Sequence, residues 1–157
     1  MIGKSVLDYV WIDEIINNEK KENQELQNKN LLIVAEGLMM YLSENEISKL
    51  LNEIYNKFYI ENKFNKINIV FDSYSKKAVK LSKIKNPVNQ MNANIKWGID
   101  DEKDFIKLNN NIEFKNKFLI EGEENNLKGI TKFVFNKVYC GKLSKNLYKI
   151  YEFQLKK

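Results

Sequence analysis

Residues 31–51, LLIVAEGLMMYLSENEISKLL, restrict the possible fold more than any other stretch of this chain. Residues 31–35 are five apolar residues without alternation, which predicts a short strand covered on both faces, as in a parallel sheet. Ser43 and Glu46 then form the S-x-x-E capping box, in which the two residues satisfy each other's backbone N–H groups. The apolar residues that follow recur at helical spacing: Ile47, Leu50, Leu51, Ile54, Tyr55 and Phe58. They predict a helix over residues 43–59 with one buried stripe.

Further helices and strands are predicted before and after this stretch. An apolar run that ends in Asp72 predicts a second strand, and strand, helix and strand with an acid after each strand describe a right-handed βαβ unit. Residues 5–18 predict an extended piece that turns into a helix. We further expect helices over 76–84 and 127–143, a short helix capped by Asp100 or Asp101, and strands over 113–120 and 147–155.

Two residue types are missing from the sequence, and their absence narrows the chemistry. All 26 basic residues are lysine, and there is no arginine and no histidine. Without histidine, Ser-His-Asp and Cys-His catalysis are excluded, and a zinc site is not expected. Arginine is the usual reader of guanine, so we expect no specific nucleic-acid partner although the net charge is +5.

Length and composition predict a single globular domain over residues 1–157. The chain is 43% hydrophobic, which is typical of proteins with a packed core. No apolar run is long enough to span a membrane, so we expect no membrane association. Cys140 is the single cysteine, which excludes an intramolecular disulfide and favours a reducing, cytoplasmic location.

Four segments of the chain resemble one enzyme family. The segment AEGLMMYLSENEISKLL, with SVLDYVWIDEI before it and NIVFDSYS and KWGIDD after it, resembles the leucine carboxyl methyltransferase family, which includes O-methyltransferases associated with polyketide biosynthesis. The resemblance implies an α/β fold with the Rossmann-like sheet of class I S-adenosylmethionine-dependent methyltransferases. It also implies an incomplete sheet, strands four to seven with flanking helices, because the family's glycine-rich loop and ribose-binding acid precede the matching part and have no counterpart here.

The same resemblance implies a cofactor, S-adenosylmethionine, and residues that hold it. Glu36 would contact the cofactor, with Gly37 in the same turn, and a carboxylate there would complement the donor's positive charge. The alternative is that Glu36 is a solvated loop acid and Gly37 serves turn geometry. Ser5, Leu7 and Asp8 would flank the adenine ring. Alternatively, Asp8 is a charge at a helix N-terminus and Leu7 belongs to the core.

Further residues are candidates for the acceptor side of the site. Met40 and Tyr41, with Met39 beside them, would line the donor or acceptor pocket, although such residues at a helix start are more often plain packing. Asp72 would face the acceptor or, alternatively, cap a helix. Trp97 resembles a residue at a corresponding position in the family. The alternative interpretation is that Trp97 packs in the core.

The leading interpretation is a methyltransferase that acts on an oxygen or carboxylate of a small-molecule acceptor. The alternative is a non-catalytic remnant domain that acts by binding a partner protein. If the first three strands of the family's sheet are absent, residues 31–35 have an unpaired edge. We therefore also expect self-association, or association with a missing N-terminal half, through that edge.

Overall fold

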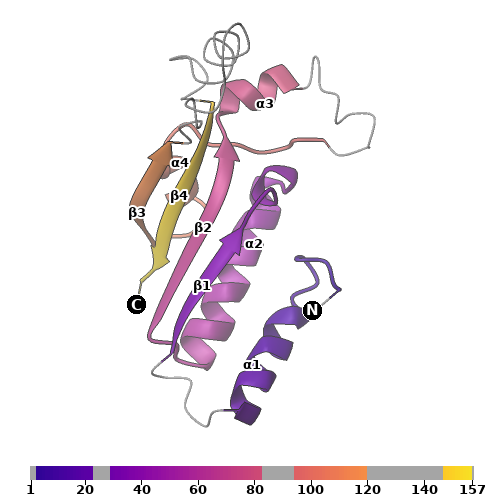
Figure 1. The fold of residues 1–157 in the computed structure, drawn as a ribbon, viewed down its shortest axis with the longest axis vertical. Helices are drawn as coiled ribbons and strands as arrows, with labels where there is room; N and C mark the ends of the chain where they lie inside the picture. Colours follow the sequence, from indigo (N-terminus) through magenta and orange to yellow (C-terminus); the bar gives the residue numbers. More distant parts are fainter. Residues whose placement is uncertain (1–2, 23–28, 83–93, 120–146, 157) are drawn as a thin grey trace, which may run out of the picture.

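The chain forms a four-stranded mixed sheet with flanking helices, seen in a computed structural model that describes residues 3–22, 29–82, 94–119 and 147–156 (Figure 1). The described elements, in chain order, are α1 (Val10–Glu22), β1 (Asn30–Ala35), the 3-10 helix η1 (Met39–Tyr41), α2 (Glu44–Ile54), the π-helix η2 (Tyr55–Glu61), β2 (Lys66–Tyr74), α3 (Lys76–Ser82), α4 (Glu102–Ile106), β3 (Ile112–Leu119) and β4 (Tyr148–Leu155). The α/β class expected from the sequence is confirmed.

The βαβ unit predicted around the opening motif is present. β1 and β2 are parallel, and α2 lies between them in sequence. The capping box is formed as expected: Ser43 Oγ accepts from the backbone N–H of Glu46, and the Glu46 carboxylate accepts from the backbone N–H of Ser43 at 2.7 Å. The predicted single helix is instead α2 followed by the π-helix η2, which stops before Lys63, a residue with a φ of 56°.

The sheet is not entirely parallel, because its last strand runs against its neighbours. The strand order is β1-β2-β4-β3, and β4 is antiparallel to both β2 and β3. β4 therefore enters the sheet between two strands that precede it in sequence. β1 is an edge strand, and no other strand in the described ranges pairs with its far side.

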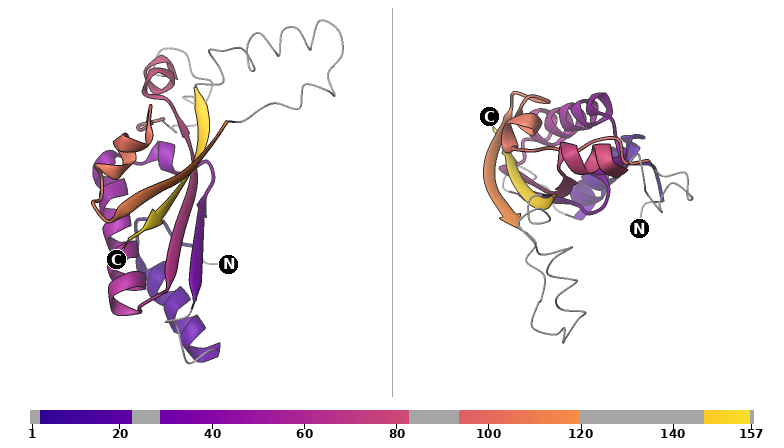
Figure 2. Two further views of the ribbon diagram at one scale, coloured as in Figure 1. Left: turned by 90° about the vertical axis from the view of Figure 1, so that its left-hand side faces the viewer. Right: turned by 90° about the horizontal axis from the view of Figure 1, so that it is seen from above.

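Only one face of β1 is covered by the described part of the chain, so the expectation of a strand covered on both faces is wrong. Leu32 and Val34 are 61% and 63% exposed, whereas Ala35 is buried and Ile33 is half-buried. Helices α1 and α2 lie on the same side of the sheet, which accounts for the difference (Figure 2). An apolar run without alternation does not by itself distinguish a doubly covered strand from an exposed edge.

The core lies between this helical side and the sheet, and an aromatic cluster occupies one end of it. Phe71 of β2 is at its centre, with ring centroids 4.6 Å from Phe105 and 5.8 Å from Phe153. Trp97 packs on the same ring at 6.0 Å and is 4% exposed, so the structure places it in the core, as its alternative interpretation held.

The remaining predictions can be compared where the structure describes the chain. The short helix α4 begins after Asp101, whose carboxylate accepts from Lys103 N–H at 2.8 Å, as expected of a cap. The strands predicted over 113–120 and 147–155 correspond to β3 and β4, and α3 corresponds to the start of the helix predicted over 76–84. The helix predicted over 127–143, and Cys140 within it, lie outside the described residues. None of the described helices is both long and apolar enough to cross a membrane.

Candidate functional site

The turn after β1 places a carboxylate at the carboxyl end of two parallel strands. Ala35 pairs with Phe71, so Glu36 and Asp72 follow side by side on neighbouring strands. Glu36 is exposed, and Gly37 has a φ of 61°, which a glycine adopts without the strain that a side chain would bring. Ligands of open α/β sheets bind beyond the carboxyl ends of the strands, so Glu36 lies at the end of the sheet where a ligand is expected.

Asp72 anchors this turn from within β2. Its side chain is 5% exposed, and Oδ1 accepts a hydrogen bond of 2.7 Å from the backbone N–H of Gly37. β2 continues to Tyr74, so Asp72 lies two residues before the strand's end, not at it. Its alternative interpretation as a helix cap is wrong, because Ser75 Oγ accepts from Ala78 N–H at the start of α3. Asp72 thus fixes the position of the turn that carries Glu36.

A tyrosine from the last described strand completes the environment of Asp72. The Tyr148 hydroxyl donates a hydrogen bond to Asp72 Oδ2, and its ring packs 4.8 Å from the ring of Tyr74, its partner across the strands. Burial, and then the bond to Asp72, raise the pKa of Tyr148 above its ordinary value of 10. The charges of Asp72 and Glu36 add to this rise. At neutral pH the hydroxyl therefore keeps its proton and remains a donor.

Tyr41 borders the same site from η1. Tyr41 is half-buried on η1, which contacts β2. Burial, and then the interaction with Tyr41, raise the pKa of Tyr74 above its ordinary value of 10. Met40 is 5% exposed, and its carbonyl accepts from the backbone N–H groups of Lys96 and Trp97 at 2.8 and 3.1 Å. Through its backbone, Met40 joins the turn after β1 to the segment before α4.

The N-terminal candidates Ser5, Leu7 and Asp8 lie in the segment that precedes α1. Ser5 and Asp8 are exposed, and Leu7 is half-buried against the core, as its alternative interpretation held. Within the described ranges, no hydrogen bond or ion pair links Ser5 or Asp8 to the turn of Glu36. Val6, between them, lines a cavity together with Leu38, which brings the segment near the turn.

Tyr74 and Tyr148 are the members of the site that sequence reasoning missed. The alternation of residues 147–155 predicted a strand, but it carried no information on which strand would be its neighbour. Once β4 pairs with β2, Tyr148 lies opposite Tyr74 and within reach of Asp72. An acid near the carboxyl end of a predicted strand is a signal to search for a donor from another strand.

A second cavity opens between the start of α2, α3 and the segment before α4. It measures about 550 Å³ and is lined by Ser43, Glu44, Asn45, Lys76, Val79, Lys80, Lys96, Trp97 and Gly98. Three of these residues are lysines, so the wall carries more positive than negative charge. Lys96 reaches Glu46 at 3.9 Å, and both groups are substantially exposed to solvent. The cavity is therefore more suited to an anionic small molecule than to a cationic one.

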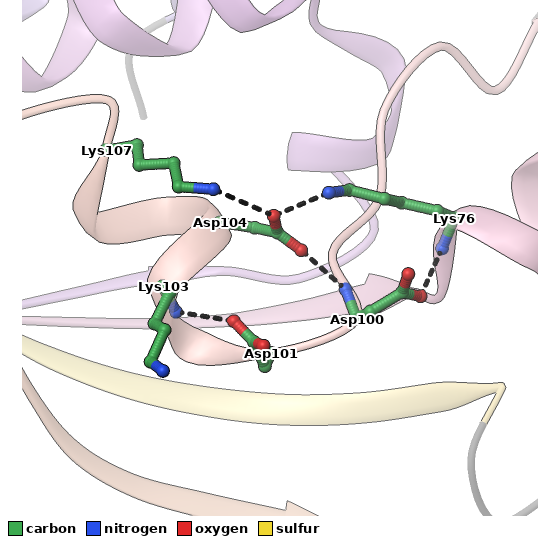
Figure 3. A network of polar contacts seen from close by, with 6 residues as sticks. All are labelled: Lys76, Asp100, Asp101, Lys103, Asp104 and Lys107. Carbon is green, nitrogen blue, oxygen red and sulfur yellow. Dashed lines mark hydrogen bonds and ion pairs between the residues drawn. The ribbon is translucent and has the colours of Figure 1, made fainter.

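A polar network next to this cavity holds α4 and the residues before it against the start of α3 (Figure 3). Asp100 Oδ1 accepts from the backbone N–H of Lys76 at 3.0 Å, and Asp104 Oδ2 accepts from the backbone N–H of Asp100 at 3.0 Å. The Lys76 ammonium lies 2.5 Å from Asp104 Oδ1. Burial alone would raise the pKa of Asp104, but the bonds from Lys76 and Asp100 outweigh it and lower the pKa. The bonds of this network are internal, so we assign it a structural role.

Asp104→Asn should make the protein less stable at neutral pH but not at low pH. The pKa of Asp104 is lowered in the folded state, so its contribution is present above the ordinary value of 3.8 and is lost as the pH falls through the folded value. We expect a loss of about 1 kcal/mol at pH 7 that shrinks as the pH falls below 3.8, measured by urea denaturation. Lys107→Gln is the control, because Lys107 is 75% exposed and 4.0 Å from Asp104. An equal loss at both pH values would contradict the charge-based account.

Comparisons of the chain with protein-family models, with curated proteins and with solved structures found no match.

Proposed function

We propose that this chain is part of an S-adenosylmethionine-dependent methyltransferase of the class I type, similar to the leucine carboxyl methyltransferase family. One observation carries the proposal: Glu36, the glutamate that the resemblance assigns to the cofactor, is exposed at the carboxyl end of β1 in a turn held by a hydrogen bond to the buried Asp72. An accessible carboxylate on a turn whose backbone is held in place is suited to bind a cation.

The chemistry of methyl transfer agrees with a site that contains no histidine. The donor is a sulfonium and is already activated, so the protein's main tasks are to align the reacting atoms and to exclude water. Glu36 would pair with the positive charge of the donor's amino acid portion. Asp72 and Tyr148 would not touch the donor but would hold the Glu36 turn in position, through the Gly37 N–H.

The acceptor would be a small molecule that offers an oxygen or a carboxylate. The lysine-lined cavity between α2 and α3 favours an acceptor with negative charge, because Lys80 and Lys96 line it in addition to Lys76, which is paired with Asp104. Tyr41 follows Met40, whose carbonyl is bonded to the wall of this cavity. Tyr41 is therefore the residue that we place between the donor and the acceptor.

The described chain should bind S-adenosylmethionine weakly. The glycine-rich loop and the ribose-binding acid of the family have no counterpart in this sequence, so much of the usual contact with the donor is missing. We expect a Kd near 1 mM, roughly −4 kcal/mol. Titration of the ¹⁵N-labelled protein should shift the amide signals of Glu36, Gly37 and Tyr41. Shifts that avoid these residues, or no shift at all, would contradict a donor site here, and calorimetry showing micromolar binding would contradict the expected weakness.

Glu36→Gln should weaken this binding by about 1–3 kcal/mol, because it keeps the shape of the side chain but removes a charge-assisted hydrogen bond. The shifts of the neighbouring amides would then vanish at the same donor concentration, while the rest of the spectrum stays unchanged. Glu61→Gln is the matched control, since Glu61 is also exposed but lies at the end of η2. Equal affinity of the Glu36 variant and the natural chain would exclude Glu36 from the site.

A second candidate function is that of a non-catalytic domain that binds a protein partner. The observation that favours it is the uncovered apolar edge of the sheet, where Leu32 and Val34 are more than half exposed. A donor titration distinguishes the two functions, because a pure binding domain has no reason to respond to S-adenosylmethionine at Glu36.

A further inference from the structure

The two edges of the sheet differ in how they are protected against association. Edge strands of natural proteins carry charges or irregular pairing that discourage another strand from adding to them. β3 has both: Glu113, Lys115 and Lys117 lie along it, and its pairing with β4 is shifted between Phe114 and Asn116. β1, with the sequence NLLIVA, has no charged residue, no proline and a regular register with β2. β1 is the unprotected edge.

The side chains of β1 make this edge a surface that favours association. Leu32 and Val34, on the outer face, are 61% and 63% exposed, and they are the two most exposed large apolar residues that the structure describes. On the inner face, Ile33 and Ala35 border a cavity of about 370 Å³ whose wall is otherwise largely apolar, with Trp11 and Ile54 among its members. Within the described ranges, no backbone hydrogen bond joins the N-terminal segment to β1. A strand placed here would cover apolar groups on both faces.

The distribution of charge around β1 indicates which strand fits. Lys29 precedes the strand and Glu36 follows it, so one end is basic and the other is acidic. Lys29 also pairs with Glu19 within the chain. A second β1 laid antiparallel brings the acidic end of each copy to the basic end of the other. A parallel copy would instead place like charges together, which is destabilising.

We propose that β1 pairs antiparallel with β1 of a second copy of this chain, about a two-fold axis at Ile33. This register places Leu32 opposite Val34 of the second copy and Leu31 opposite Ala35, so every apolar residue of the strand faces an apolar partner. The two-fold axis makes each contact occur twice, as in most symmetric dimers. The product is a continuous eight-stranded sheet, because each copy contributes its four strands. The proposal does not rest on the methyltransferase assignment.

The pairing can be tested by exchanging charges at the two exposed positions. Leu32 and Val34 point to solvent in a single copy, so charged residues there should leave the fold of one chain intact. Two double variants place like charges opposite one another: Leu32→Lys/Val34→Lys and Leu32→Glu/Val34→Glu. The variant Leu32→Glu/Val34→Lys places opposite charges there, but only in the antiparallel register.

Sedimentation velocity at about 10–100 μM and low salt should show the natural chain as a dimer and both like-charge variants as monomers with unchanged circular dichroism. The mixed variant should dimerise at least about tenfold more tightly than either of them. Ile60→Lys is the control: Ile60 is 55% exposed on η2, and the dimer should persist.

A monomeric natural chain at about 100 μM, or dimers that survive both like-charge variants, would overturn the pairing. A mixed variant as monomeric as the like-charge ones would overturn the antiparallel register. The titration with S-adenosylmethionine, followed at Glu36, tests the methyltransferase proposal independently of this strand pairing.

Discussion

Phe71→Ala should lower the free energy of unfolding by about 3–5 kcal/mol, the usual cost of removing a fully buried phenylalanine side chain. Phe71 is 1% exposed, and its ring contacts three further aromatic rings besides Trp97. Domains are typically stable by only about 5–15 kcal/mol, so this single change would remove a large share of the total. Urea denaturation followed by circular dichroism measures the loss, and the near-ultraviolet signal of Trp97 should weaken with it.

The control for this change is Phe118→Ala on the edge strand β3. Phe118 is 50% exposed, so its truncation removes the same atoms without opening a cavity in the core. We expect a loss of no more than about 0.5 kcal/mol, as for most surface substitutions. Similar losses for the two variants would mean that the aromatic cluster does not form the centre of the core.

Gly98→Ala is the second change with a large expected effect, although it adds only one carbon atom. A Cβ at Gly98 would lie 2.4 Å from the carbonyl oxygen of Tyr74 and 2.7 Å from Val79 Cγ2. The first of these is a backbone atom that also accepts the hydrogen bond of Ile99 N–H, so it cannot move without disturbing the end of β2. We expect a loss of about 2–3 kcal/mol from this overpacking, measured as a shift of the urea midpoint.

Alanine substitutions at two other glycines distinguish the destabilising effect of steric crowding from that of backbone strain. A Cβ at Gly3 would meet no atom within 4 Å, so Gly3→Ala should be nearly neutral. Gly37 also has open space, but its φ of 61° disfavours a side chain, and Gly37→Ala should cost about 1–2 kcal/mol through strain alone. If Gly98→Ala were as harmless as Gly3→Ala, the segment before α4 would not pack against β2 as described.

What the sequence predicted correctly is mostly local. The capping box at Ser43, the buried stripe of α2 and the cap of α4 at Asp101 each depend on residues within a few positions of one another. Their hydrogen bonds join neighbouring residues, so spacing alone reveals them. The turn at Glu36 and Gly37 was located from the end of an apolar run, but its anchor, Asp72, lies 35 positions away and was not predicted.

What the sequence did not predict depends on contacts between distant segments. The exposure of Leu32 and Val34 follows from β1 being at the edge, which is decided by strand order rather than by composition. The link between Asp72 and Tyr148 spans 76 positions of the chain. No periodicity encodes such a pairing, because each strand satisfies its own pattern whichever neighbour it has.

The position of β4 has a consequence for how the protein is made. β4 is the last of the described strands to be synthesised, yet it lies between β2 and β3. Until residues 148–155 leave the ribosome, β3 lacks the strand with which it pairs in the described part of the chain, and the sequence separation of this contact slows its formation. A nascent chain therefore exposes an open edge of β2, with Asp72 still lacking its tyrosine donor. Growing chains are therefore most prone to associate through this edge in the interval before the last strand arrives.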